Sequence, residues 1–326
     1  WLVPTAEVAL NALHQGKIID PDMLPLKYVA QTPSFRKEHA AGGRDVRGIK
    51  RVHQFEKVEM FRYVEPQDSE AGLEEMLAEA QPELVLEGLV HDKKAELFET
   101  CAQAGVHLLL DKPLCRTLDD WQRIRDAIAA HPIEISMWFT SRSHPPFIAL
   151  RRAILDGELG EIASLISTHP HKMRRETGTP WYFDPDIYTG PFHDLACHGV
   201  DQVRWLTGAE CVGVHALQTC KRFTDEPQLN DHVQASFQLA DQSLATLTAD
   251  WLTPQESPSF GDTRFIVMGT EGSAHLRAYA EDHLLIVSNK RGAYEPELPA
   301  GTEDTFVADM IDAIDRGDVP RALDCL

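Results

Sequence analysis

The chain has 326 residues, of which 43% are hydrophobic and 25% charged, a composition typical of a folded protein with one large or two medium domains. The formal net charge of −20 disfavours DNA or RNA as a general partner, because an even negative field repels nucleic-acid phosphates. No apolar stretch approaches the roughly 20 residues of a membrane span. The six cysteines show no C-x-x-C spacing, which predicts reduced thiols of a cytoplasmic protein and no metal site.

The first 80 residues predict a small α and antiparallel β segment. Apolar residues at helical spacing behind Thr5, a candidate N-cap, predict a helix over 4–14. Two β-rich runs, 27–37 and 50–64, flank a basic loop with glycines, and this arrangement predicts an antiparallel hairpin with a long connection. A capped amphipathic helix is expected over 69–80.

From Pro82 the pattern changes to alternating strands and helices. Short apolar strands alternate with helical segments, and the first of these helices ends at Gly105: strands 84–86, 106–110 and 133–139, helices 91–104 and 118–130. A β-α-β-α-β order predicts parallel strands joined by right-handed crossovers.

Beyond Pro145 the pattern predicts an α+β domain with a largely antiparallel open sheet. Its expected helices are 147–155, 198–206 and 305–316, and its clearest strands are 233–239, 243–251 and 265–268. The predicted fold class is therefore α/β plus α+β, in three parts: 1–80, 82–140 and 141–326.

The basic loop of the first part suits a nucleotide. Arginines 36, 44, 47 and 51 lie near Glu38 and Phe55, and guanidinium groups can bind phosphate while an aromatic ring stacks on a base. A solvated basic hairpin with one exposed phenylalanine is the simpler alternative, and the residues alone leave both open.

The stretches PTAEV and TPSFRKEHAAGGRDVRGIKRVHQFEKVEM resemble the catalytic core, around motif 2, of seryl-tRNA synthetase, a class II enzyme. The resemblance covers residues 1–80. It implies ligands for serine and ATP: Thr5 and Glu7 for the serine amino group, Arg36 for the α-phosphate, Glu38 for the adenylate, Phe55 for adenine and Glu59 for serine. Motif 1, the motif 3 arginine and the coiled-coil arm are absent. We therefore expect serine activation to fail, and tRNA not to bind.

Two further motifs carry chemistry in the longer part of the chain. Asp111-Lys112-Pro113 follows a buried strand, and the carboxyl ends of parallel strands form the ligand crevice of an open α/β sheet. Asp194, His198 and Asp201 have the spacing of one helix face, and a carboxylate beside an imidazole raises its pKa and suits it to acid/base work. A surface turn, a helix cap and a core histidine are the simpler alternatives.

The stretches AGVHLLLDKPLCRTLDD, GPFHDLACHGVDQVRWLTG and GTEGSAHL resemble the Gfo/Idh/MocA family of NAD(P)-dependent oxidoreductases. The resemblance covers residues 82–326. It implies NAD or NADP as cofactor, a sugar, inositol or other polyol as substrate, and a homodimer through the 141–326 sheet. It also implies site residues: Lys112 and His198 as catalytic, Asp194 in support, and Asp111, Pro113 and Asp201 in substrate or cofactor binding.

The family's first βαβ unit, with its G-x-G-x-x-G turn, is absent from the sequence. We therefore expect weak dinucleotide binding and an unpaired sheet edge. The join near 80–82 cuts both folds in mid-sheet. Three hypotheses follow: a working oxidoreductase whose first 80 residues stand in for the missing unit, residual adenylate chemistry with ATP in the synthetase segment, or a non-catalytic product of a chimeric or truncated reading frame whose 141–326 sheet dimerises.

Overall fold

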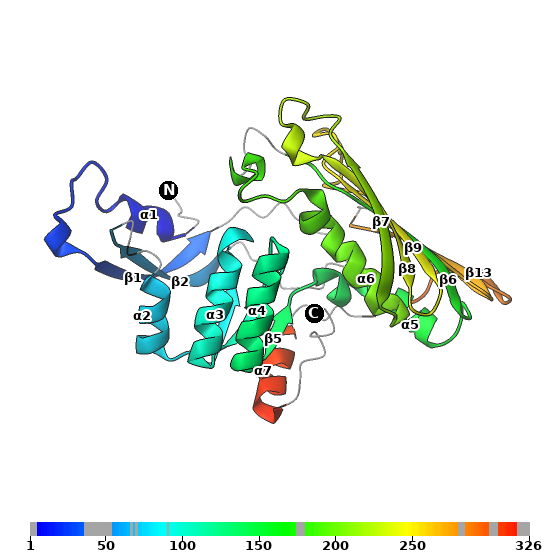
Figure 1. Ribbon diagram of the computed structural model, residues 1–326, viewed down its shortest axis with the longest axis horizontal. Helices are drawn as coiled ribbons and strands as arrows, with labels where there is room; N and C mark the ends of the chain where they lie inside the picture. Colours follow the sequence, from blue (N-terminus) through cyan, green and yellow to red (C-terminus); the bar gives the residue numbers. More distant parts are fainter. Residues whose placement is uncertain are drawn as a thin grey trace. The chain divides into compact units, whose positions relative to one another are not determined.

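The computed structural model describes residues 5–35, 54–65, 68, 71–89, 91–173, 180–279, 284–299 and 306–317. The chain divides into two compact units, Trp1–Pro82 and Glu83–Leu326 (Figure 1). Among the described helices, none combines the length and the apolar composition needed to cross a membrane.

The first unit is an antiparallel hairpin with two helices. Its elements are α1 (Glu7–Ala12), β1 (Leu26–Phe35), β2 (Gln54–Tyr63) and α2 (Ala71–Ala80). The register pairs Leu26 with Tyr63 and Phe35 with Gln54. The predicted hairpin is thus confirmed, and its loop lies outside the described residues.

Side chains of the hairpin hold both helices. Glu75 of α2 accepts from Lys27 at 2.5 Å and also pairs with Arg62. The Tyr63 hydroxyl donates to the carbonyl of Leu10 at 2.7 Å and so fastens α1 to β2. Hydrogen bonds and ion pairs from the hairpin's side chains therefore attach both helices to it.

The sequence predicted Thr5 as the N-cap of the first helix, and this prediction is wrong. Ala6 occupies the N-cap position and makes no side-chain cap, while the Thr5 hydroxyl accepts from the Glu7 amide at 3.2 Å. Thr5 instead bonds to Glu59, as described below.

One face of this hairpin is uncovered among the described residues of the first unit. Val29 and Met60, which are paired across the strands, are 70% and 83% exposed, and Val58 is also exposed. Two strands with an open apolar face are marginally stable by themselves. A hairpin with this exposed apolar face is typical of two strands taken from a wider sheet.

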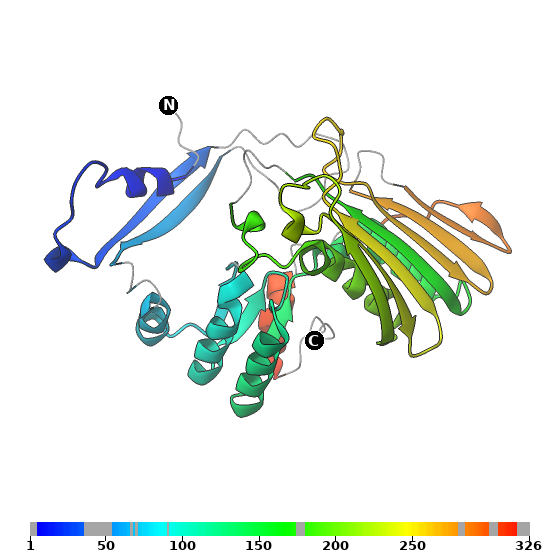
Figure 2. The ribbon, with the colours of Figure 1, turned by 45° about the horizontal axis from the view of Figure 1, so that its top comes forward.

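The second unit begins with a three-stranded parallel sheet in the order β3-β4-β5. Its elements are β3 (Leu84–Glu87), α3 (Lys94–Ala104), β4 (His107–Leu110), α4 (Leu118–Ala130) and β5 (Ile135–Met137). The α3 helix ends at Gly105, whose φ of 71° is the left-handed conformation that glycine favours. Figure 2 shows α3 and α4 side by side along this sheet.

The open edge that the sequence predicted is present among the described residues. There β3 pairs with β4 alone, and Leu86 on this edge strand is exposed.

The rest of the second unit is built on an eight-stranded sheet in the order β13-β12-β11-β10-β6-β9-β8-β7. Its strands are β6 (Ile162–Pro170), β7 (Cys211–Thr219), β8 (His232–Leu239), β9 (Leu244–Asp250), β10 (Thr263–Gly269), β11 (Gly272–Ala278), β12 (Leu284–Asn289) and β13 (Gly292–Tyr294). Its helices are α5 (Pro145–Leu155) and α6 (Cys197–Thr207), and α7 (Phe306–Arg316) closes the described chain. Only β6 and β9 run parallel, so the predicted largely antiparallel sheet is confirmed.

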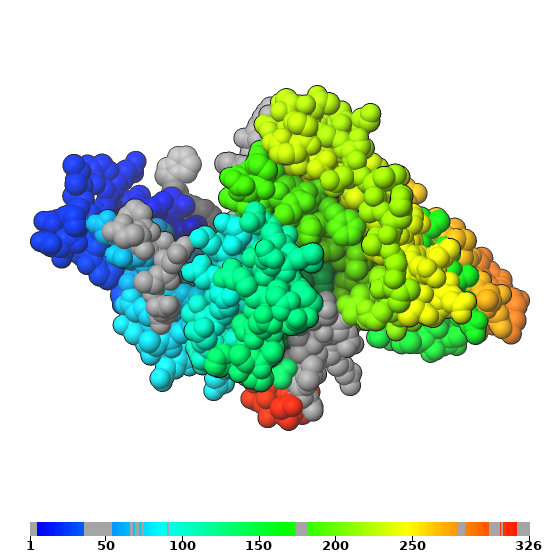
Figure 3. Space-filling view, viewed as in Figure 1, coloured from blue at the N-terminus to red at the C-terminus, as the bar shows by residue number. Residues whose placement is uncertain are grey.

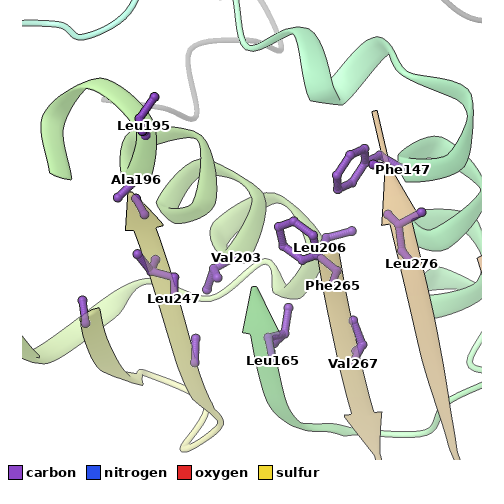
Figure 4. Packing of buried hydrophobic residues seen from close by; sticks show 14 of the residues in the cluster. Phe147, Leu165, Leu195, Ala196, Val203, Leu206, Leu247, Phe265, Val267 and Leu276 are labelled. Carbon is purple, nitrogen blue, oxygen red and sulfur yellow. The ribbon is translucent and has the colours of Figure 1, made fainter. Parts of the chain in front are cut away.

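The main core lies between this sheet and helices α5 and α6. Figure 4 shows Phe147 of α5 and Leu206 of α6 directed toward Leu165, Phe265 and Val267 of the sheet. All five side chains are buried. Burial of side chains of this size contributes about 1.5–3 kcal/mol each, so the core fixes α6 against the sheet.

The segment before α6 differs from the sequence prediction. Phe192–Ala196 forms a π-helical turn, and the α-helix begins at Cys197. The three acidic and imidazole side chains therefore do not share one regular α-helix: Asp194 lies on the π turn, and His198 and Asp201 lie on α6. Such turns are wider than an α-helical turn and are frequent at functional sites.

Candidate active site

Lys112 lies just beyond the carboxyl end of β4, as the sequence predicted. Its ammonium forms an ion pair with the Asp194 carboxylate and donates to the Asp194 carbonyl at 2.8 Å. The two side chains are 22% and 3% exposed. Lys112 and Asp194 are 82 positions apart in the sequence, and their contact joins the end of the parallel sheet to the π turn.

The charge state of Lys112 follows from this contact. Burial is the largest single effect and lowers the pKa of Lys112, but the charge and hydrogen bond of Asp194, together with Cys197 and Asp111, outweigh it, so that the net pKa lies above its usual value. The side chain is therefore an ammonium at neutral pH and can donate a hydrogen bond to an oxygen.

Asp194 is held by a chain of buried hydrogen bonds. The Tyr188 hydroxyl donates to Asp194 Oδ2 at 3.3 Å, and Trp251 Nε1 donates to the Tyr188 oxygen at 2.9 Å. Burial and then the Asp194 charge raise the pKa of Tyr188 well above its usual value, which keeps the phenol a donor. The carboxylate is thereby fixed in its orientation toward Lys112.

His198 is neutral, and the expectation that Asp194 raises its pKa is wrong. Burial, followed by the positive charge of Lys112, lowers the pKa of His198 to about 3. Asp194 instead pairs with Lys112 and accepts from Tyr188. A neutral imidazole at this position has a nitrogen that can accept a hydrogen bond.

Two further histidines flank His198. His169 lies near the end of β6 and His171 just after it, and His169 is buried, with a pKa of about 3 that follows from burial. Gly199 permits this approach, because a Cβ there would lie 2.6 Å from His169 Nε2. The sequence analysis missed His169 and His171; the motif His-Pro-His at 169–171 was the available signal.

Asp201 makes a different contact from the one expected of a ligand. Arg142, which follows β5, donates to both of its carboxylate oxygens at 3.0 and 2.5 Å. Both carboxylate oxygens therefore serve in attaching α6 to the end of the parallel sheet. The sequence analysis did not predict a role for Arg142.

Asp111 and Pro113 complete the turn that carries Lys112. Asp111 Oδ1 accepts from the Lys112 amide at 2.8 Å, and the Lys112–Pro113 peptide is cis. The Asp111 carbonyl accepts from Lys94 of α3.

Two cavities adjoin these residues. The larger, of about 640 Å³, opens between α4 and α6 and is lined by Pro113, Trp121 and Phe139 among others, in the teal to green part of the surface in Figure 3. The smaller, of about 320 Å³, is lined by His198 and its two neighbouring histidines. Within the described part of the chain, no group of three or more His, Cys, Asp or Glu is arranged to hold a metal ion.

The described residues provide part of a site for a nicotinamide dinucleotide. The described parallel sheet has three strands, and the sequence has no G-x-G-x-x-G turn whose amides would hold the pyrophosphate.

The first unit brings together two of the expected synthetase residues. The Thr5 hydroxyl donates to Glu59 Oε1 at 2.5 Å, and Lys57 donates to Thr5 at 3.2 Å and pairs with Glu59. Glu7 is exposed at the start of α1, and Phe55 is half-buried on β2. The predicted phosphate and adenylate ligands, Arg36 and Glu38, lie outside the described residues.

Two sequence models of one family match the chain. Residues 30–137 match the model described as oxidoreductase family, NAD-binding Rossmann fold, and residues 147–275 match the GFO/IDH/MocA C-terminal domain. The first match begins within the hairpin unit, whereas the described parallel strands begin at Leu84.

A curated relative of a different kind matches a shorter stretch. The serine–tRNA ligase of Roseiflexus sp. (strain RS-1) is 55% identical over 89 residues, which are 27% of this chain and 21% of the ligase. The chain thus spans about a fifth of the length of this curated relative.

Solved structures show the fold of the longer part. An oxidoreductase from Thermotoga maritima superposes with a TM-score of 0.70 at 20% identity, over 76% of this chain and 74% of that one. Levoglucosan dehydrogenase in complex with NADH gives 0.66 at 22% identity, over 75% and 74%. Together with the two sequence matches, these superpositions show that the chain carries domains of the Gfo/Idh/MocA oxidoreductase family.

Proposed function

We propose that the chain is an oxidoreductase of sugars, inositols or other polyols, with Lys112 and His198 as its catalytic residues. The observation that carries the proposal is the Lys112–Asp194 ion pair close to the neutral His198. Levoglucosan dehydrogenase, which shares the fold, supports a carbohydrate substrate and a nicotinamide cofactor.

The geometry supports a separate role for each side chain. The Lys112 ammonium would donate to the substrate oxygen and stabilise negative charge on it, since Asp194 keeps the amine protonated. The neutral His198 would accept the hydrogen of the substrate hydroxyl. Asp194 acts through Lys112, whose ammonium it holds in place.

NAD or NADP would supply the redox chemistry when bound. Without a glycine-rich turn for the pyrophosphate, we expect weaker affinity than that of a complete dinucleotide site. Titration of the full chain with NADH, followed by quenching of tryptophan fluorescence, tests this step, because Trp121 lines the larger cavity. The absence of saturable quenching up to millimolar NADH contradicts the oxidoreductase proposal.

Activity is tested by NADH formation from millimolar NAD and a panel of polyols. Lys112→Met and His198→Asn should each lower the rate about 100-fold or more, the usual effect of losing a positioned acid or base. Arg123→Met is the matched control, because Arg123 is an exposed cation of α4 paired with Glu99. Equal rates in all three variants would argue against both catalytic assignments.

We infer that residues 1–80 are a segment of a seryl-tRNA synthetase core. The identity to the ligase, the Thr5–Glu59 hydrogen bond and the open face of the hairpin support this origin. ATP would be its nucleotide, but without a motif 3 arginine we expect no serine-dependent ATP–pyrophosphate exchange. Exchange that disappears in Arg36→Ala would reveal residual activation and contradict this expectation.

We propose further that the join near residues 80–82 connects pieces of two genes, and that the chain is a chimeric or truncated product. Long-read sequencing of the source DNA across codons 70–92 tests this. Single reads that span the join support a physical fusion. Reads that lead into a complete synthetase on one side and a complete oxidoreductase on the other contradict it.

We also propose a homodimer through the eight-stranded sheet. The face away from α5 and α6 carries exposed apolar side chains on three strands: Ile166, Leu217 and Met268. An apolar face of this kind is typical of a surface that pairs with another protein. A cytoplasmic location is proposed as well, supported by the free thiols of the described cysteines.

A further inference from the structure

The smaller cavity is lined by uncharged residues, most of which carry a polar group. Among its described lining residues are His169, His171, His198, Ser141, Gln202 and Tyr279, and none of the described lining residues is Lys, Arg, Asp or Glu. Its volume of about 320 Å³ lies at the lower end of the roughly 300–1,000 Å³ of ligand sites, which suits a molecule of monosaccharide size.

Its three imidazoles stay neutral. Burial is the first cause that lowers the pKa of each, to about 3 for His169 and His198. The nearest charged groups that act on them, Lys112 and Asp194, are paired with each other. The cavity therefore offers no unpaired positive charge to an anion.

Two polar atoms of lining residues lack a partner. Gln202 is 1% exposed, and its Oε1 and the Nδ1 of His171 have no hydrogen-bond partner among the described residues. Both atoms are closed to solvent, so a ligand hydroxyl would reach them only after a small side-chain movement; the hydrogen bond formed would then offset the roughly 1–3 kcal/mol cost of an unsatisfied buried polar group. The hydroxyls of Ser141 and Tyr279, 3.0 Å apart, provide groups that both donate and accept.

We propose that this cavity selects an uncharged polyhydroxy ligand, a neutral monosaccharide or cyclitol, over sugar acids and sugar phosphates. A carboxylate or phosphate would lose its hydration beside neutral imidazoles with no free cation in exchange. This selectivity rests on the proposed function, because His198 lines the cavity. It adds the charge class of the substrate, which the family resemblance leaves open.

The test compares matched ligands on the full chain without any dinucleotide. Saturation-transfer NMR is recorded with myo-inositol and D-glucose as neutral probes, and with D-gluconate, D-glucuronate and glucose 6-phosphate as anionic ones. We expect the neutral probes to bind at least about tenfold more tightly, the equivalent of 1.4 kcal/mol. Equal or tighter binding of the anions, or no binding of the neutral probes, overturns the proposal.

A variant that adds a positive charge to the cavity tests the same selectivity from the protein side. Thr263→Lys adds an ammonium to the cavity lining and should move the preference about tenfold toward the acids. Thr246→Lys adds the same charge on an exposed position of β9 and should leave the preference unchanged. An equal shift in both variants would overturn a role for the cavity. If Thr263→Lys does not fold, the comparison of neutral and anionic probes on the unmodified chain still tests the proposal.

The result is separable from that of the proposed function. Neutral-sugar binding that persists without hydride transfer supports the cavity's selectivity and counts against the redox activity alone. Hydride transfer with acids preferred would support the redox activity and overturn the selectivity.

Discussion

Lys94 and Glu87 form an ion pair in the interior of the parallel sheet unit, with Nζ and Oε2 2.9 Å apart and side chains 1% and 0% exposed. Lys94 also donates to the Asp111 carbonyl, and Glu87 Oε1 accepts from the Leu89 amide at 2.5 Å. Lys94 is the first residue of α3, where the helix dipole disfavours a cation. Glu87 offsets that cost and, through Lys94, the end of β3 is joined to the turn that carries Lys112.

Removing one partner of this pair should be costly. Lys94→Met leaves a buried carboxylate uncompensated and should lower the free energy of unfolding by about 3–5 kcal/mol. Lys94→Met combined with Glu87→Leu removes both charges and should recover most of that loss. Guanidinium chloride denaturation measures both.

Arg123→Met is the control for this comparison, because the Arg123–Glu99 pair is exposed and such pairs contribute about 0–1 kcal/mol. A loss in Lys94→Met no larger than in Arg123→Met would contradict the structural role of the buried pair.

Gly199 sets how closely α6 approaches β6. In Gly199→Ala the new methyl group would lie 2.6 Å from His169 Nε2, and His169 is buried against Phe265. Overpacking of this kind should lower the free energy of unfolding by about 1–3 kcal/mol. Gly88→Ala is the control, since the methyl group that it adds would have no described atom within 4 Å beyond its chain neighbours. Thermal unfolding of the two variants should differ clearly, and equal melting temperatures would contradict the close contact.

Stability should fall below neutral pH because of the buried histidines. The pKa values of His169 and His198 are about 3 in the folded chain, against about 6.5 in an unfolded chain. The unfolded state therefore binds more protons between these values, and the stabilisation present above pH 6.5 is lost as the pH falls toward 3. Each histidine contributes a slope of about 1.4 kcal/mol per pH unit in that window.

Denaturation curves from about pH 7.5 to about pH 4.5 measure this slope. His169→Asn should show a shallower decline than the unmodified chain, whereas His215→Asn, at an exposed position of β7, should run parallel to it. Parallel curves for His169→Asn would contradict a neutral buried His169.

The proposed dimer predicts a mass of twice 36.5 kDa in light scattering. Leu217 of β7 is 67% exposed on the open face of the sheet, and Leu217→Asp should shift the chain toward monomer, because burial of an unpaired carboxylate opposes association. Leu155→Asp, at the exposed end of α5, should leave the mass unchanged. A monomeric unmodified chain would refute the dimer.

Local sequence patterns were enough to predict the order and type of most elements. Apolar spacing and Gly105 predicted α3, and the short apolar run before Asp111 predicted β4, because period and chain punctuation are local properties. The position of Lys112 at the carboxyl end of a strand followed from the same local pattern. Both family resemblances also rested on contiguous residues.

The pairing of the site residues could not be predicted from sequence spacing and follows from how the chain folds. Asp194 is i,i+4 to His198 in sequence, yet its carboxylate pairs with Lys112, 82 positions away, after a π turn that no local spacing indicated. The pKa of His198 is lowered and not raised, because burial and the nearby Lys112 outweigh a carboxylate already neutralised by that lysine. Burial and charge pairing depend on which surfaces the fold brings together, and residue spacing along one helix does not contain that information.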